Sequence, residues 1–476
     1  MNLTGQGRPP SSPGTPAGLE QEVVLEALAR HLPPERIDAA LEGTEGRRKR
    51  RVRKLPARAV VWLVIAIGLF GDGDTASLWR QVVGTLAALW RAAAGAKPPC
   101  KSALSQARAR LGPRPVRRLF RSTAAAGAKT TRGATYKMIP LKAMDGDDYT
   151  LPDTPANARA FGRATTVRGG VTVQAGYPQA HVTRLIEVGT RLTIEALVKP
   201  QDANDHPSAP YLLSRCAAGD LVLWDCGFYS YKLVAQAVEQ GTFVLGPVPC
   251  HAVLDPIERL GDGSYLAKVY PDCDCRKRDK GGVTVRVIEY TFDDPGRPGH
   301  GERHRLITTL LDAGAHPAAE LVALYHERWE IEIANDEITT HQIARPAAGT
   351  ELRSKTPAGV VQEIYGVLLA HNAVRGLMAE AASAVDVDPR TLSFMHAVRV
   401  VRETVPLMRA ARTKLLPLLY AAMLGHIAQG VLPPRDGRIN PRVVKVKMSN
   451  FAKKRPEHYH ATQPTKPFVD SIVMLN

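Results

Sequence analysis

The chain of 476 residues has few cysteines and few aromatic residues, and no secretory signal is recognisable. Six cysteines scattered over this length do not suggest a disulfide framework, so a reducing cytoplasm is expected. Cys273-Asp274-Cys275 lacks the second ligand pair of a structural zinc site, with Cys250 and His251 as the nearby candidates. The apolar run Ala59 to Phe70 has twelve residues, short of the roughly 20 that span a bilayer. It is interpreted as a buried helix, and no membrane partner is expected.

Acidic residues are scarce at both ends of the chain. Residues 1–140 hold 24 Lys and Arg against 9 Asp and Glu (+15), residues 141–434 hold 30 against 34 (−4), and residues 435–476 hold 9 against 3 (+6). Seven cations fill eight positions in Arg47-Arg48-Lys49-Arg50-Arg51-Val52-Arg53-Lys54. This distribution predicts double-stranded DNA as a partner, held by basic ends around a centre that binds metal. A compositional bias of an Ala- and Arg-rich chain is the alternative.

The octapeptide at 325–332, Tyr-His-Glu-Arg-Trp-Glu-Ile-Glu, lies in a stretch with helical spacing. Tyr325, Arg328 and Glu332 follow at i, i+3 and i+7, so they project from one face of a helix. An Arg fork can hold phosphate oxygens and a carboxylate can hold a divalent cation, so this face suits a phosphodiester with a metal. A salt bridge on a solvated helix is the alternative interpretation.

Two further carboxylates are predicted at the ends of apolar strands. Residues 138–145, Met-Ile-Pro-Leu-Lys-Ala-Met-Asp, end in Asp145, and residues 220–225, Asp-Leu-Val-Leu-Trp-Asp, end in Asp225. Each alone fits an ordinary turn, because Asp followed by a nearby Gly is a common way to leave a strand. Two such aspartates followed by a helix glutamate are a stronger signal together. Asp147 and Asp148 compete with Asp145, which is preferred because it ends the apolar run.

These segments resemble the DDE transposases of bacterial insertion sequences, in particular the insertion sequence 4 family of cut-and-paste enzymes. The resemblance rests on Met-Asp-Gly-Asp-Asp-Tyr-Thr-Leu-Pro-Asp-Thr-Pro-Ala-Asn (144–157), Ala-Phe-Gly (160–162), Asp-Cys-Gly-Phe-Tyr-Ser (225–230) and the Tyr325, Arg328, Glu332 signature. It extends to residues 101–108 and 441–445 and covers nearly all of the chain from about residue 35. One position departs from the family signature: Thr339 replaces a Lys that helps to hold the element-end DNA.

The resemblance implies an α/β fold with a ribonuclease H-like catalytic core and a β-rich insertion, flanked by an all-helical N-terminal domain and a helical C-terminal region. In that core the first and fourth strands are neighbours, so Asp145 and Asp225 would meet at adjacent strand ends. The strand and helix patterns fit this order. The expected parts are a disordered segment 1–18, a helical DNA-binding domain 19–135, a core 136–345 with its insertion at about 249–303, C-terminal helices 346–430 and a basic tail 431–476. Strands are predicted at 171–175, 181–187, 191–196, 242–248, 264–270, 283–292 and 304–311, and helices at 230–240, 357–382 and 406–429.

The resemblance also implies a DNA transposase that cleaves phosphodiester bonds at element ends and transfers strands into target DNA, with a hairpin intermediate. Three carboxylates supply the charge and oxygen ligands for two Mg²⁺ or Mn²⁺ ions. Asp145 would bridge both ions, Asp225 and Glu332 would bind one each, and Tyr325 and Arg328 would position the phosphate.

Two element ends must be paired in such a reaction, so a homodimer on double-stranded DNA is expected. The expected location is the bacterial cytoplasm at the nucleoid, and no small-molecule substrate is expected. Two other functions stay open: a catalytically weakened DNA-binding remnant, which Thr339 favours, and a ribonuclease H-like nuclease without strand transfer.

Overall fold

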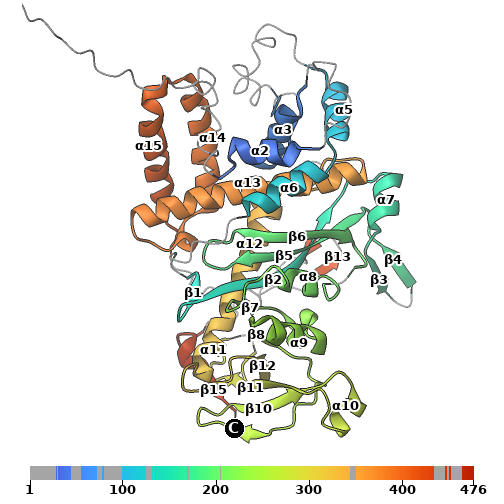
Figure 1. The fold of residues 1–476 in the computed structure, drawn as a ribbon, viewed down its shortest axis with the longest axis vertical. Coiled ribbons are helices and arrows are strands. Elements are labelled where there is room, and N and C mark those ends of the chain that lie inside the picture. Colours follow the sequence, from blue (N-terminus) through green and yellow to red (C-terminus); the bar gives the residue numbers. More distant parts are fainter. Residues whose placement is uncertain are drawn as a thin grey trace, which may run out of the picture.

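The structure, a computed structural model, describes residues 28, 31–43, 55–71, 78–79, 99–124, 131, 133–168, 171–203, 205–297, 299–343, 350–433, 445–447, 450–451 and 464–475. The predicted disordered segment 1–18 lies outside these residues. So do the predicted DNA-binding residues Arg47, Arg48, Lys49, Arg50 and Arg51. In Figure 1 a long helix, α13 (Pro357–Ala384), runs between the N-terminal helices and a large sheet.

The large sheet is mixed, with the strand order β6-β5-β2-β7-β8-β12-β11-β10-β9. β6, β5 and β2 are antiparallel to one another, whereas β7 and β8 run parallel to β2. β7 is a short apolar run buried on both faces, as expected of a central parallel strand. The strands are β2 (Ile139–Thr150), β5 (Gln179–Glu187), β6 (Thr193–Pro200), β7 (Leu221–Leu223), β8 (Phe243–Pro247), β9 (Glu258–Arg259), β10 (Tyr265–Val269), β11 (Val283–Phe292) and β12 (His304–Thr308), with β1 (Thr135–Tyr136) paired to β2.

The strands predicted for the insertion extend this same sheet. β12 pairs antiparallel with β8, and β11 and β10 follow in antiparallel order. The short helix α10 (Cys273–Lys277) lies between β10 and β11 at the far end of the sheet (Figure 1). Near the end of the chain, β15 (Ile472–Met474) pairs with β11. The chain is therefore a mixed α/β protein whose central sheet has helices on both sides.

Two strand predictions need correction. The strand predicted to end at Asp145 continues to Thr150, because its antiparallel partner β5 pairs with it over the whole of that length. β7 pairs with β2 only over Leu141–Ala143. Only this part of β2 lies between two strands, so the apolar part of β2 is shorter than the strand. The predicted strand 171–175 is β4 (Val171–Gln174), and it pairs with β3 (Thr165–Arg168) in a separate hairpin instead of in the central sheet.

Two glycines allow α13 to approach the N-terminal helices. α3 (Ala57–Leu69), the helix expected from the apolar run at 59–70, packs against α13. A Cβ atom at Gly68 would lie 2.7 Å from Val367 Cα, and one at Gly366 would lie 2.7 Å from the Val64 carbonyl oxygen. Each helix therefore needs a residue without a side chain at the crossing. α2 (Pro34–Leu41), α5 (Lys101–Leu111) and α6 (Arg114–Thr123) belong to the same layer.

The C-terminal helices differ from the prediction at Pro406. One helix over 406–429 is predicted, but Pro406 lies inside α14 (Phe394–Ala410), and α15 (Leu416–Ala428) follows after a break. α14 begins at Ser393, whose hydroxyl accepts a hydrogen bond from the backbone amide of His396 at 3.3 Å. A serine N-cap satisfies a free amide of the first turn, and here it is a stronger start signal than the proline. α14 and α15 stand side by side at one end of α13 (Figure 1).

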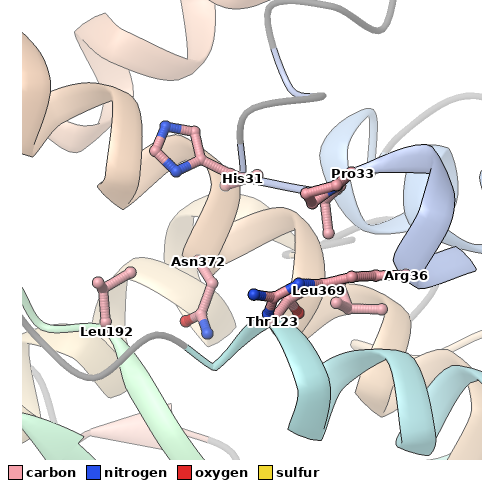
Figure 2. Close-up of a pocket in the computed structure, with 9 residues that line it drawn as sticks. His31, Pro33, Arg36, Thr123, Leu192, Leu369 and Asn372 are labelled. Carbon is pink, nitrogen blue, oxygen red and sulfur yellow. The ribbon is translucent and has the colours of Figure 1, made fainter.

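A cavity of about 150 Å³ lies where the N-terminal helices meet α13 and the turn between β5 and β6 (Figure 2). Its lining residues are His31, Leu32, Pro33, Arg36, Thr123, Leu192, Leu369, Asn372 and Ala373. The carboxylates predicted for catalysis do not line it, so this cavity is not the site of their chemistry. Within the described part of the chain, each helix is too short or too polar to cross a membrane.

Candidate active site

The register of two parallel strands places Asp145 beside Asp225. β2 and β7 pair with Ala143 opposite Leu223. Asp145 lies two residues after Ala143, and Asp225 lies two residues after Leu223. The two carboxylates therefore occupy equivalent positions on neighbouring segments. Asp225 follows the end of β7, where its Oδ1 accepts a hydrogen bond from the Gly227 amide at 2.9 Å. The structure thus brings the two predicted aspartates together.

Glu332 reaches this place from a helix that packs on the strand of Asp145. It lies in α12 (Trp329–Asp336), which follows α11 (Ala318–Tyr325) and the single turn η3 (His326–Arg328). α12 contacts β2 through its buried face, which includes Ile331 and Asn335. The negative charges of Asp225 and Glu332 both act on Asp145. The charges of the three predicted carboxylates therefore act on one another, although the residues come from positions separated by 80 and 107 residues.

Arg328 lies among these carboxylates. Its Nη2 donates to Glu332 Oε1 at 2.6 Å, and its guanidinium carbon is 6.0 Å from the centre of the Tyr325 ring. The Arg328 side chain is only 12% exposed. The i, i+4 salt bridge of the alternative interpretation is therefore present, but it lies in a half-buried site and not on a solvated helix face. Burial raises the pKa of Tyr325 to about 12, so its hydroxyl stays protonated and can donate a hydrogen bond.

The two aspartates carry more negative charge than their surroundings neutralise. Burial raises the pKa of Asp145 to about 7; the guanidinium of Arg328 opposes this shift, and the charges of Asp225 and Glu332 add to it. Burial also raises the pKa of Asp225, against the same guanidinium. Carboxylates that repel one another in a half-buried place are stabilised by any added cation. This electrostatic arrangement is typical of a site that binds a metal ion or a proton.

The competing residues Asp147 and Asp148 have other partners. The pKa of Asp147 is raised to about 6, mainly by burial, and its Oδ1 accepts a hydrogen bond from the Asp148 amide at 2.9 Å. Asp148 Oδ1 lies 2.9 Å from His181 Nδ1 on the neighbouring strand β5. The charges that act on Asp145 are those of Arg328, Asp225 and Glu332. Those that act on Asp147 are the charges of Arg184, Asp148 and Glu351. These contacts favour Asp145 as the first carboxylate.

Asn335 and Arg184 support Asp145, and neither is singled out from the sequence. Asn335 Nδ2 donates to Asp145 Oδ2 at 3.3 Å, and Asn335 Oδ1 accepts a hydrogen bond from the guanidinium of Arg184. Arg184 lies opposite Asp145 in the pairing of β2 with β5 and is fully buried. Its bond therefore fixes the amide of Asn335 with the nitrogen toward Asp145. Asn335 could have been found from its position, because it follows Glu332 by three residues and so lies next to it on the same helix.

Asp205 is a second unexpected neighbour of the site. A Cβ atom at Gly146 would overlap the Asp205 carboxylate, so Asp205 packs directly against the residue after Asp145. Its Oδ1 lies 2.8 Å from His181 Nε2 and accepts a hydrogen bond from Thr183 at 3.0 Å. Gly146 is thus a glycine because the Asp205 side chain occupies its Cβ position. A loop aspartate of this kind leaves no periodic signal in the sequence.

The donor set suits a divalent metal by its chemistry. Asp145, Asp225 and Glu332 offer hard oxygen ligands of the type that Mg²⁺ and Mn²⁺ prefer. In the described part of the chain, no group of three or more His, Cys, Asp or Glu side chains is placed so that it could hold a metal ion as it stands. Arg328 Nη2 contacts Glu332 Oε1, so the guanidinium balances part of the negative charge of Glu332.

Thr339, the departure from the family signature, lies in a π-helical turn (Glu337–Gln342) that continues α12. Its hydroxyl donates to the Asn335 carbonyl at 2.9 Å. The side chain is therefore used within its own helix and supplies no cation for DNA. π-helical turns occur often near functional sites because they change the rotation of the residues that follow.

Comparison with known proteins identifies the family of the chain. Residues 22–121 match the family model described as insertion element 4 transposase N-terminal, and residues 139–373 match the transposase DDE domain. The chain is 32% identical over 434 residues to the transposase InsG for insertion sequence element IS4 of Escherichia coli strain K12, with 88% of this chain and 92% of InsG covered.

Two more distant proteins are also similar. InsZ of the same strain, named as a transposase, is 29% identical over 217 residues, which covers 45% of this chain and 68% of InsZ. A chain of the piggyBac transposase synaptic complex with hairpin DNA aligns with a TM-score of 0.43 and 14% identity, covering 88% of this chain and 87% of that one. DDE transposase domains generally depend on a divalent metal ion. The match to the DDE domain, the match to the N-terminal family model and the extent of the identity to InsG show the family. The chain belongs to the insertion sequence 4 family of DDE transposases and is a DNA transposase.

Proposed function

We propose that Asp145, Asp225 and Glu332 are the catalytic carboxylates of this transposase, and that they hold two Mg²⁺ or Mn²⁺ ions in a ribonuclease H-like core. The observation that carries the proposal is the register of β2 and β7, which aligns Asp145 with Asp225 while α12 brings Glu332 to the same place. The strand order β6-β5-β2-β7-β8 supports the ribonuclease H-like assignment, because the strands of Asp145 and Asp225 are parallel neighbours.

Each carboxylate has a role that its position suggests. Two divalent cations about 3.5–4 Å apart activate the attacking oxygen and stabilise the leaving oxygen of a phosphodiester. Asp145, at the centre of the strand pair, would contact both ions, and Asp225 and Glu332 one each. The Asn335 amide keeps Asp145 Oδ2 oriented toward the helix. Since the pKa of Asp145 is about 7, this carboxylate gives up its proton near neutral pH when a cation is available.

Arg328 and Tyr325 would bind the scissile phosphate. When Glu332 turns to the cation, the Arg328 guanidinium is left without its carboxylate partner, and a phosphate can take that place. The Tyr325 hydroxyl, protonated at neutral pH, lies beside this guanidinium and can donate to a phosphate oxygen. Arg328 would thus balance the charge of Glu332 before DNA binds, and Arg328 and Tyr325 would both be phosphate ligands afterwards.

The proposed reaction begins with hydrolysis at the element end. The freed 3′-hydroxyl attacks the opposite strand, which releases the flanking DNA and closes a hairpin. A second water opens the hairpin, and the 3′-hydroxyl that this frees attacks a phosphodiester of the target DNA. Two ends must be held together, so a homodimer assembles on double-stranded DNA, in the bacterial cytoplasm at the nucleoid. The basic residues Arg47, Arg48, Lys49, Arg50 and Arg51 would bind the phosphate backbone.

A catalytically weakened, DNA-binding form is the second candidate function, and Thr339 is the observation that favours it. The Thr339 hydroxyl bonds to its own helix, so one terminal DNA contact of the family is missing. This form predicts DNA binding without cleavage. A nuclease without strand transfer would instead cleave the end and leave no joined product, so a strand-transfer assay separates all three.

Cleavage of duplexes that carry the inverted repeats flanking the gene tests the proposal. Wild type should cleave with Mg²⁺ or Mn²⁺ and not with EDTA, and Asp145→Asn should bind the duplex but not cleave it. Asp153→Asn is the matched control, because Asp153 is an exposed aspartate of the same segment that pairs with Arg163. Undiminished cleavage by Asp145→Asn would refute the assignment.

A further inference from the structure

We propose that Arg191 is a positioning residue, which fixes the helical segment of Glu332 so that its carboxylate faces the two aspartates. The inference rests on the proposed function of Glu332. Arg191 lies in the turn between β5 and β6, far from the octapeptide in sequence, and it does not touch the reacting groups. It acts through two other glutamates of the same helical segment.

Arg191 bridges two glutamates that lie on either side of Glu332. Its Nε donates to Glu330 Oε2 at 2.5 Å and its Nη1 to Glu337 Oε1 at 2.7 Å. Glu330 and Glu337 are seven residues apart, two helical turns, and so lie on one face. A planar guanidinium bound at both ends resists sliding of the helix along its axis and rotation about it. Glu332 lies within the bridged segment and must keep its position with it.

The far end of this bridge is itself held by the long helix α13. Glu337 Oε2 lies 3.1 Å from Arg375 Nε and 3.1 Å from His371 Nε2, and both partners are fully buried. The Arg191 side chain is 2% exposed. Three elements therefore meet at Glu337: the β5–β6 turn, α13 and the π-helical turn that follows α12. A buried ionic network of this kind specifies one arrangement of its elements more strictly than apolar packing does.

The backbone of Arg191 gives an independent reason to assign it a role. Its φ is +60°, in the left-handed region where Gly and Asn are favoured. The turn is closed by hydrogen bonds from the Arg191 amide to the Glu187 carbonyl at 2.8 Å and from the Glu187 amide to the Leu192 carbonyl at 2.9 Å. A glycine would satisfy these bonds without strain. A long cationic side chain at a strained position indicates that the side chain is needed there.

A side chain that binds a metal must be held within a fraction of an ångström of its position, whereas the fold as a whole tolerates larger shifts of its helices. Loss of the Arg191 bridge should therefore affect the metal site before it affects DNA binding. An Arg whose only role is to stabilise the fold would lower stability and leave metal affinity in the folded protein unchanged. The two roles can be separated by measuring metal binding directly.

The test titrates the full-length protein with Mn²⁺, followed by electron paramagnetic resonance, and compares Arg191→Gln with wild type. The expected result is at least a tenfold weaker Mn²⁺ affinity. At saturating element-end duplex the cleavage rate should fall by a similar factor, with the half-saturating DNA concentration changed less than twofold. Arg191→Lys, which can reach one glutamate but not both, should be intermediate. Arg121→Gln is the control, because Arg121 pairs with the buried Glu195 away from α12.

Unchanged Mn²⁺ affinity in Arg191→Gln, or an equal loss in Arg121→Gln, would overturn the inference. If Arg191→Gln does not fold, Glu330→Gln removes one end of the bridge and leaves Glu337 with its partners in α13; it should weaken Mn²⁺ binding in the same direction. Asp145→Asn in the same titration distinguishes the two proposals. If Asp145→Asn keeps wild-type Mn²⁺ affinity, the proposed metal site is wrong; if it loses affinity while both bridge variants keep it, only the role of Arg191 is wrong.

Discussion

Two groups of acidic side chains near α12 differ in how their charge is balanced. Burial alone would raise the pKa of Glu337, but the guanidiniums of Arg375 and Arg191 and the hydrogen bond with His371 hold it well below its usual range. At the other group, burial and the charges of Asp225 and Glu332 raise the pKa of Asp145 to about 7, against the guanidinium of Arg328. The first group is neutralised by the protein and stabilises the structure. The second is left short of cations, as a site that takes its cations from solution requires.

The largest expected effect is a loss of end cleavage when an aspartate of the second group, that of Asp145, is replaced. Asp225→Asn should abolish end cleavage and, in the absence of metal, raise the midpoint of thermal unfolding. Because the pKa of Asp225 is raised in the folded protein, its ionised form is destabilising near neutral pH, and the amide removes that charge. Cleavage gels and thermal unfolding in EDTA measure both quantities. A variant that is inactive and less stable than wild type would contradict this account of the site.

At the first group, that of Glu337, a substitution should lower the stability of the protein. Glu337→Gln leaves Arg191, Arg375 and His371 buried without their shared carboxylate. Removing one partner of a buried ionic pair costs about 3–5 kcal/mol in the free energy of unfolding. Urea unfolding in the absence of metal checks this value. A cost below about 1 kcal/mol would show that the network is not the structural anchor proposed here.

The pH dependence of stability should also differ between the groups. Burial lowers the pKa of His371 to about 4 from its usual 6.5. The unfolded chain therefore binds a proton before the folded protein does, and stability should fall by up to about 3 kcal/mol as the pH drops from 6.5 to 4. Asp145 acts in the opposite direction, because its raised pKa makes the fold more stable as the pH falls below 7.

Urea titrations in the Asp145→Asn background remove the opposing contribution of Asp145, and the difference made there by a second substitution at His371 isolates that of His371. Adding His371→Gln to this background should flatten the stability profile between pH 6.5 and 4. An unchanged slope in the double variant would show that another group causes the loss of stability in acid.

The smallest effect is expected at an ion pair that is not buried. Lys277 and Asp274 lie 3.7 Å apart in α10, with 70% and 78% of their side chains exposed. Asp274→Asn should change the free energy of unfolding by less than about 0.5 kcal/mol, because solvent screens exposed pairs. Urea unfolding in parallel with Glu337→Gln makes the comparison. If Asp274→Asn and Glu337→Gln lower the free energy of unfolding equally, burial does not explain the difference between exposed and buried ion pairs.

Much of the catalytic strand pair could be predicted from the sequence. Leu221–Leu223 is a short apolar run followed by an aspartate, and strand periodicity together with the family resemblance is enough to place Asp225 at a strand end. The extension of β2 to Thr150 could not be predicted, because Asp147 and Asp148 are tolerated only through their contacts with β5. Pro406 is a misleading signal, because a proline favours a helix start, whereas here it lies inside α14, which begins after Ser393.

The residues that support the site are harder to predict than the carboxylates. Arg184 and Arg191 meet Asn335, Glu330 and Glu337 across 139 or more residues of sequence. No local pattern encodes such a pairing, because it depends on where the β5–β6 hairpin lies relative to α12. Arg191 even occupies a turn position where sequence rules favour glycine.

The most direct test of the metal site is a crystal structure of the protein with element-end DNA and Mn²⁺, in which anomalous scattering locates the ions. Two Mn²⁺ peaks about 3.5–4 Å apart should lie among Asp145, Asp225 and Glu332, with Arg328 turned from Glu332 to a phosphate oxygen. Mn²⁺ peaks bound by other residues, or Glu332 still paired with Arg328 in a complex that cleaves DNA, would contradict the account.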